Sequence, residues 1–173
     1  MRTLIVVDMQ NDFIDGALAN PAAQAIIPAM TQYIEGFVGE IIFTRDTHFA
    51  NYLDTQEGKN LPITHCLHGT SGWKVHGDLL KAACRDGRYW SCKVNKMSFG
   101  DVNGLVETMD AYSDEIYICG TCTDICVVSI ALNLKAQFPE KKIYCLSGLC
   151  AGTSPEAHDA ALMVMRSCQI EVI

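Results

Sequence analysis

The chain alternates short, strongly apolar runs with longer segments in which apolar residues recur at helical spacing. The short runs predict buried strands, and the longer segments predict helices. The predicted strands are residues 3–7, 40–44, 89–93, 115–119, 142–146 and 170–173. The predicted helices are residues 21–37, 75–83, 102–109, 124–138 and 155–167. This alternation indicates an α/β, three-layer, Rossmann-like fold in which helices cover both faces of a six-stranded parallel sheet.

One polar segment interrupts this alternation. Residues 46–72 are rich in Asn, Asp, Thr, His, Gly and Pro, and they are too many for an ordinary connection in a compact domain. Long connections of this kind are usually functional. No internal repeat, low-complexity tract or linker divides the chain, so we expect a single domain over residues 1–173.

Composition excludes some classes of function. The formal net charge of -7, without a basic stripe, argues against binding to nucleic acid or to an anionic membrane. Asp8 cuts off the apolar run at residues 4–7, which is too short for a signal-peptide core or a membrane span. Nine cysteines are present, an odd number, and Cys119, Cys145 and Cys150 lie in or beside hydrophobic stretches where thiols act as small core residues. A reducing, cytoplasmic setting fits best.

Polar residues follow several of the predicted strands. Asp8 follows the first strand, Asp46 and His48 follow the second, Lys96 comes shortly after the third, and the turn at residues 120–126 follows the fourth. In open parallel sheets, ligands bind at the carboxyl ends of the strands. These residues are therefore the candidates for a functional site.

Cys126 is the candidate nucleophile. It lies where the turn after the fourth strand leads into a helix, so its thiol is expected over the first turn of that helix. Unpaired backbone N–H groups and the positive end of the helix dipole favour a thiolate there and can also hold an oxyanion. Two other interpretations remain open: Cys126 could be a buried core cysteine, or it could form a metal pair or redox couple with Cys122, although the spacing is not C-x-x-C.

A thiol nucleophile needs a group that takes its proton, and Asp8 is the candidate. Desolvation can raise the pKa of a carboxylate that emerges from an apolar strand, which suits it to accept and then return a proton. The ammonium of Lys96 would stabilise the thiolate. Alternatively, Asp8 could cap the following turn, Lys96 could be a solvated surface charge, and Lys93 could take its place.

Three blocks of the sequence resemble the signature motifs of the isochorismatase-like cysteine hydrolases. They are LIVVDMQNDF at residues 4–13, KMSFG at residues 96–100 and GTCTDICV at residues 120–127, and their order and spacing match the family. The resemblance covers essentially the whole chain, and it implies the isochorismatase-like hydrolase fold.

The same resemblance assigns roles to individual residues. It implies a catalytic triad of Asp8, Lys96 and Cys126. It also implies a non-proline cis peptide bond between Thr121 and Cys122, and an oxyanion hole formed by the backbone N–H groups of Cys122 and Cys126.

The long polar segment contains a candidate metal site. Asp46, His48, Glu57 and His65 offer two imidazoles and two carboxylates, which suit Zn²⁺, Fe²⁺ or Mn²⁺ and leave coordination positions open. Such side chains in a polar loop could also be merely exposed to solvent. The nicotinamidase branch of the family carries Asp-x-His and a later Pro-x-x-His-Cys-x-x-Gly-Thr motif, which residues 62–70 resemble. The resemblance implies that these four side chains bind a divalent metal, zinc first, with iron or manganese as alternatives.

The resemblance therefore implies a metal-assisted amidohydrolase that converts nicotinamide or a similar small amide to the acid and ammonia through a thioester. In this hypothesis the metal holds the ring nitrogen and Phe13 packs against the ring. One alternative is a metal-independent isochorismatase-like hydrolase of another small amide or a vinyl ether. Another is a non-enzymatic zinc or redox protein that uses the loop ligands and the cysteine pair. Members of this superfamily commonly assemble, so we also expect a homo-oligomer.

Overall fold

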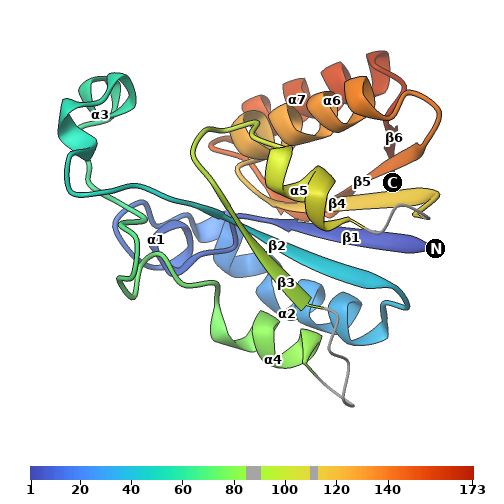
Figure 1. The fold of residues 1–173 in the computed structure, drawn as a ribbon, viewed down its shortest axis with the longest axis horizontal. Coiled ribbons are helices and arrows are strands. Elements are labelled where there is room, and N and C mark those ends of the chain that lie inside the picture. Colours follow the sequence, from blue (N-terminus) through green and yellow to red (C-terminus); the bar gives the residue numbers. More distant parts are fainter. Residues whose placement is uncertain (85–90, 110–112) are drawn as a thin grey trace.

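A sheet of six parallel strands forms the centre of the computed structural model, which describes residues 1–84, 91–109 and 113–173 (Figure 1). The strand order is β3-β2-β1-β4-β5-β6. The strands are β1 (Arg2–Val7), β2 (Glu40–Asp46), β3 (Ser91–Lys96), β4 (Glu115–Thr121), β5 (Lys142–Ala151) and β6 (Glu171–Val172). All of their pairings are parallel. The predicted class of fold is confirmed.

Helices cover both faces of the sheet (Figure 1). On one face lie α2 (Pro21–Gly36) and α4 (Gly77–Ala83), and on the other lie α5 (Asn103–Thr108), α6 (Val128–Gln137) and α7 (Pro155–Ser167). Shorter elements occupy the connections: α1 (Asn11–Ile14), η1 (Tyr52–Asp54), α3 (Gln56–Asn60) and η3 (Thr123–Val127). Among the described residues, none of the helices has both the length and the apolar character needed to cross a bilayer.

Local sequence explains the burial of the sheet and the start of its main helices. Residues 4–7 of β1 are all fully buried, as expected for the centre of a sheet that is covered on both faces. Asn20 caps α2 by accepting a hydrogen bond from a backbone N–H, and Ser154 caps α7 in the same way. In both helices proline follows the cap, where its fixed φ suits the first helical turn.

Several predicted boundaries differ from the structure. The strand predicted at residues 89–93 runs instead from Ser91 to Lys96, and residues 89 and 90 lie outside the described part of the chain. Lys96 was predicted to follow this strand, but it ends the strand and pairs in register with Asp46 of β2. The helix predicted from residue 124 begins as a π-helical turn at Thr123. The segment at residues 46–72, for which no helix was predicted, contains η1 and α3.

The strand order places a crevice at the carboxyl ends of β1 and β4. The chain passes from β1 to β2 and β3 on one side and then crosses to β4 on the other, so β1 and β4 meet at the switch point where ligands bind in such sheets. Gly120 allows the two strands to approach closely. Its φ is +126°, and a Cβ there would collide with the backbone of Val7, including its carbonyl oxygen.

Candidate active site

Asp8, Lys96 and Cys126 lie together in this crevice. The Nζ of Lys96 is 2.8 Å from Oδ2 of Asp8 and 3.4 Å from Sγ of Cys126. Asp8 and Lys96 are fully buried, and Cys126 is 5% exposed. Lys93, the rival lysine, is exposed. The structure therefore brings the predicted triad together from three different strand ends.

Asp8 is held in a constrained conformation. Its φ of 49° lies in the left-handed region, which is uncommon for residues other than glycine and often marks functional sites. The hydroxyl of Thr44 donates to Oδ1 of Asp8 over 2.6 Å and accepts from the Asp8 N–H over 3.1 Å. Burial raises the pKa of the Asp8 carboxyl, although the Lys96 ammonium opposes this shift. The expected effect of desolvation is confirmed, and it suits a carboxylate that accepts a proton.

The charges of Lys96 and Cys126 respond to the same neighbours. Burial lowers the pKa of Lys96. The negative groups around it, Asp8 first, raise the pKa by more than burial lowers it, so the net pKa lies above its usual value. Burial and the Asp8 carboxylate raise the pKa of the Cys126 thiol well above its usual value, and Lys96 opposes them. The prediction that the helix start favours a thiolate at rest is therefore wrong. The thiol keeps its proton until a base takes it.

The turn that carries Cys126 has an unusual backbone. The peptide bond between Thr121 and Cys122 is cis, as the resemblance implied. Cys126 lies within η3, where the N–H of Val127 donates to the carbonyl of Cys122 over 3.0 Å. π-helical turns of this kind are rare and frequently occur at functional sites.

Side chains from this turn anchor it to the segment around α7. Asp124 accepts two hydrogen bonds from Thr153, one from its N–H at 2.8 Å and one from its hydroxyl at 2.6 Å. The hydroxyl of Thr123 lies 2.9 Å from Nδ1 of His158. These contacts fix the position of the turn, and therefore of the Cys126 thiol, relative to the end of β5.

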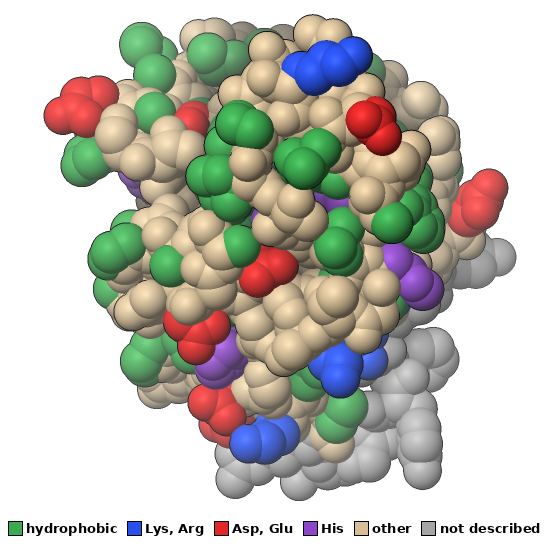
Figure 2. Space-filling model, turned by 90° about the vertical axis from the view of Figure 1, so that its left-hand side faces the viewer, with side chains coloured by type: hydrophobic (Ala, Val, Ile, Leu, Met, Phe, Trp, Pro, Cys, Tyr) green, Lys and Arg blue, Asp and Glu red, His purple; other side chains and the backbone are tan. Residues whose placement is uncertain are grey.

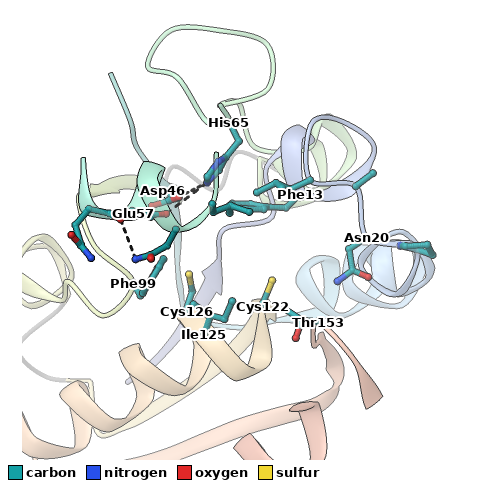
Figure 3. Close-up of a pocket in the computed structure, with 16 residues that line it drawn as sticks. Phe13, Asn20, Asp46, Glu57, His65, Phe99, Cys122, Ile125, Cys126 and Thr153 are labelled. Carbon is teal, nitrogen blue, oxygen red and sulfur yellow. Dashed lines mark hydrogen bonds and ion pairs between the residues drawn. The ribbon is translucent and has the colours of Figure 1, made fainter. Parts of the chain in front are cut away.

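The four predicted metal ligands form one cluster, and Figure 3 shows three of them, Asp46, Glu57 and His65. Their candidate ligand atoms all lie within 4.8 Å of one another. Oδ2 of Asp46 is 2.9 Å from Nε2 of His48 and 3.6 Å from Nε2 of His65. Glu57 approaches from α3, with Oε1 3.6 Å from Nε2 of His48.

The donor set fits a divalent metal. Nδ1 of His65 lies 2.8 Å from the carbonyl of Ile63, to which it can donate, and this tautomer leaves Nε2 free as a ligand. Burial raises the pKa of Asp46, but the neighbouring His48, His65 and Lys96 lower it by more, so this carboxylate is ionised. Two imidazoles with two carboxylates suit zinc, iron or manganese.

Neighbouring side chains hold these ligands in place. Gln10 bonds to the backbone of Asp46 in both directions, since its amide oxygen accepts the N–H at 2.7 Å and its amide nitrogen donates to the carbonyl at 2.9 Å. The ring of Tyr52 packs on His48 and His65, with centroid distances of 4.6 and 5.1 Å. Gln10, Tyr52 and Thr44 were not predicted from the sequence as supporting residues. For Thr44 the sequence does hold one signal. Thr44 and Asp46 are two positions apart in β2, so their side chains lie on the same face of the sheet.

Asp46 joins the metal cluster to the triad. Its Oδ2 faces His48 and His65, whereas its Oδ1 lies 3.3 Å from the Nζ of Lys96. The two groups of side chains are thus parts of one charged network rather than separate sites.

A cavity of about 820 Å³ opens over both groups (Figure 3). Cys126 points into the cavity from η3, and Cys122 points into it from the position just before η3. Asp46, Glu57 and His65 line the opposite wall. Phe13, the predicted ring-packing residue, also lines the cavity, and its ring centroid is 5.6 Å from that of His65. None of the described residues that line the cavity is Lys or Arg.

Known proteins share this fold and sequence pattern. The nicotinamidase/pyrazinamidase of Mycobacterium tuberculosis is 28% identical, over 100% of this chain and 98% of its own length. The pyrazinamidase of Pyrococcus horikoshii, solved in complex with zinc, is 30% identical with a TM-score of 0.81, over 99% of this chain and 98% of that one. The nicotinamidase/pyrazinamidase of Bacillus subtilis has a TM-score of 0.85 at 24% identity over the same shares of the two chains, which supports the fold.

A family model agrees with these relatives. The isochorismatase domain model matches residues 2–173, which is nearly the whole chain. The chain therefore belongs to the isochorismatase family, in its nicotinamidase-like branch.

Proposed function

We propose that this protein is a metal-assisted cysteine amidohydrolase that converts nicotinamide or a similar small heteroaromatic amide to the acid and ammonia. The observation that carries the proposal is the Cys126 thiol, which lies beside Asp8 and Lys96 and faces a cavity whose opposite wall holds the metal-binding cluster. The broader class, a hydrolase of amide carbon–nitrogen bonds, follows from the family and from relatives such as the nicotinamidase/pyrazinamidase of M. tuberculosis.

The first half of the reaction is acylation of the enzyme. Asp8 takes the thiol proton as Sγ of Cys126 attacks the carbonyl carbon, and the backbone N–H groups of Cys122 and Cys126 hold the resulting oxyanion. The carbon–nitrogen bond then breaks, and ammonia leaves with the proton that Asp8 returns. Each oxyanion donor in such sites contributes about 3 kcal/mol, and acid–base catalysis contributes roughly two to four orders of magnitude in rate.

The second half releases the acid. Asp8 takes a proton from water as the water oxygen attacks the thioester, and the proton goes to the departing sulfur of Cys126. Lys96 keeps its proton throughout, because the surrounding negative groups raise its pKa. When a divalent metal is held by Asp46, His48, Glu57 and His65, its open positions supply a binding site for a heteroatom of the substrate or for water.

The charge of the cavity favours a neutral substrate. Among the described residues that line it, Asp46 and Glu57 are acidic and none is Lys or Arg. Lys96 is fully buried and already paired with Asp8 and Asp46. A carboxylate on the substrate would therefore find no counter-ion among these residues, which favours a neutral heteroaromatic amide over acid-bearing substrates.

Ammonia release from a panel of amides tests this function. We expect turnover of nicotinamide and pyrazinamide by the metal-loaded protein, slower turnover of simple ureides, and loss of activity after chelation that added metal restores. If rates with and without chelator are equal, the protein is instead a metal-independent member of the family. If no compound in the panel releases ammonia, the proposed function is wrong.

Replacing the two cysteines separately tests their roles. Cys126→Ala removes the nucleophile, so kcat for nicotinamide should fall by several orders of magnitude. Cys122→Ala should keep kcat/KM within about tenfold, because only its backbone N–H is needed. Steady-state ammonia assays on both variants, with circular dichroism to check folding, measure this. An equal loss of activity in the two variants contradicts the assignment.

A further inference from the structure

The cavity extends beyond the reacting atoms. We call the part lined by Leu18, Ala19, Asn20, Pro21 and Thr153 the far lobe. In Figure 3, Asn20 and Thr153 lie to one side of the two cysteines, whereas the wall with the metal-binding cluster lies on the other. A substrate whose ring faces that wall and whose carbonyl lies over Cys126 leaves the far lobe open.

The volume of the cavity exceeds what a one-ring amide needs. The cavity measures about 820 Å³. If each of the roughly nine non-hydrogen atoms of a primary amide takes up the volume of one water molecule, roughly 30 Å³, the amide would fill about a third of the cavity. The remaining space lies within the usual range for pockets that enclose larger ligands.

The polar side chains of the far lobe are already engaged. Oδ1 of Asn20 accepts from the N–H of Ala22 and Nδ2 donates to the carbonyl of Gly152, each at 2.9 Å. Thr153 donates both its N–H and its hydroxyl to Asp124. Ala19, Pro21 and Thr153 are exposed and Leu18 and Asn20 are half-buried, so a polar group placed there would exchange bonds to water for few bonds to the protein and gain little affinity.

The rest of the far lobe is apolar and uncharged. Leu18, Ala19 and Pro21 supply its other side chains, and no Lys or Arg occurs among the described cavity-lining residues. Figure 2 shows the face on which α1 and α3 lie, where the few Lys and Arg side chains stand apart from one another and hydrophobic side chains are scattered, most of them in the upper half. An anionic extension of the substrate is therefore disfavoured, and an apolar one is favoured.

We infer, on the basis of the proposed function, that the preferred substrate is a neutral amide that carries an apolar group in the far lobe. This group is attached either to the ring or to the amide nitrogen. In the second case the same reaction applies: the thioester forms, the carbon–nitrogen bond breaks, and a primary amine leaves in place of ammonia with the proton from Asp8. Water then releases the same acid.

Two substrate series distinguish these attachments. The first is nicotinamide with methyl to propyl groups on the ring, and the second is nicotinamide with the same groups on the amide nitrogen. One methylene in a fitting pocket changes kcat/KM by roughly 10- to 200-fold. We expect at least a tenfold higher kcat/KM than for nicotinamide in one series, measured by chromatography of the acid product.

A variant that fills the far lobe supplies the matched control. Ala19→Leu adds volume there, so the ratio of kcat/KM for the better alkylated amide to that for nicotinamide should fall at least tenfold. Ala17→Leu changes a nearby exposed alanine that does not line the cavity, and this ratio should stay within about twofold. An unchanged ratio in Ala19→Leu overturns the inference.

The outcomes also separate this inference from the proposed function. If nicotinamide is hydrolysed and every alkylated amide in both series is a poorer substrate, the inference is wrong and the proposed function stands. If no amide of any size is hydrolysed, both are wrong.

Discussion

Asp8 and Lys96 are fully buried, and each charge would be strongly unfavourable there alone. Their contact of 2.8 Å offsets part of the desolvation, and the hydroxyl of Thr44 supplies a further hydrogen bond to the carboxylate. The balance leaves the pKa of Asp8 raised while Lys96 stays protonated. The raised pKa makes the Asp8 carboxylate a stronger base towards the thiol of Cys126, although its negative charge also raises the pKa of that thiol.

Thr44 offers a test of this balance. Thr44→Val removes the hydroxyl that stabilises the Asp8 carboxylate, so the pKa of Asp8 should rise further. A base with a higher pKa remains protonated to a higher pH, so the acid limb of kcat/KM should move to higher pH. We expect kcat/KM at neutral pH to fall about tenfold.

The control for this change keeps the hydroxyl. Thr44→Ser should leave the acid limb where it is in the unmodified protein. A pH–rate profile of all three proteins, with metal content measured at each pH, checks the result. If Thr44→Val lowers the rate but leaves the acid limb in place, Thr44 does not tune Asp8.

The sequence predicted the residues that share one strand edge but not those that support them. Asp8, Lys96 and Cys126 follow from strand ends and motifs. Thr44 and Gln10 act through hydrogen bonds to residues 36 positions away, which depend on how β1 and β2 are aligned. The thiol pKa of Cys126 depends on burial by distant segments, so local reasoning about the helix start gave the wrong direction.

At the scale of elements, the end of β4 determines where the thiol of Cys126 lies. Gly120 approaches Val7 of β1 too closely to allow a side chain, and its φ of +126° is one that L-residues rarely adopt. The cis peptide bond between Thr121 and Cys122 and the π-helical turn η3 come immediately after Gly120 in the chain. Close packing of β4 against β1 therefore places the turn at residues 120–126 over Asp8.

Gly120→Ala should destabilise this junction. The added Cβ would collide with the backbone of Val7 and require an unfavourable φ, so the free energy of unfolding should fall by about 2 to 4 kcal/mol. Gly148→Ala in β5 is the matched control, because a Cβ there meets no atom within 4 Å, and it should change stability by less than about 1 kcal/mol. Urea unfolding of both variants measures the difference. Equal stability of the two would contradict the packing argument.

The elements whose signal is local were predicted well, and those that depend on partners were not. The segment at residues 155–167 has a cap, a proline and helical spacing, and α7 has the same bounds. β3 extends to Lys96 because it pairs with β2 as far as Asp46, although its own sequence is polar there. β5 continues to Ala151 because its pairing with β4 shifts register between Ile118 and Gly120, which no local pattern indicates.

At the scale of the whole molecule, the metal cluster and the hydrophobic core occupy different places. The core packs around β1 and its neighbours, whereas Glu57 and His65 belong to the long segment between β2 and α4. A metal would therefore tie that segment to the edge of a sheet that is already stabilised by burial.

Chelation should separate activity from folding. Removing the metal should abolish amide turnover but leave the far-UV circular dichroism at 25 °C unchanged. Bound at about 100 times its Kd, a metal stabilises the folded state by about 2.7 kcal/mol. For a chain of this size its loss should lower Tm by roughly 5 to 10 °C. Unfolding at 25 °C on chelation would instead support a zinc protein whose fold depends on the metal.

Asp46 has one oxygen directed to the histidines and the other to Lys96. No substitution there can therefore change metal affinity while leaving the electrostatic environment of the nucleophile intact. Even without a metal, this carboxylate would still share with Asp8 the compensation of the buried lysine charge. An aspartate at this position in a relative is therefore by itself no proof of a metal enzyme.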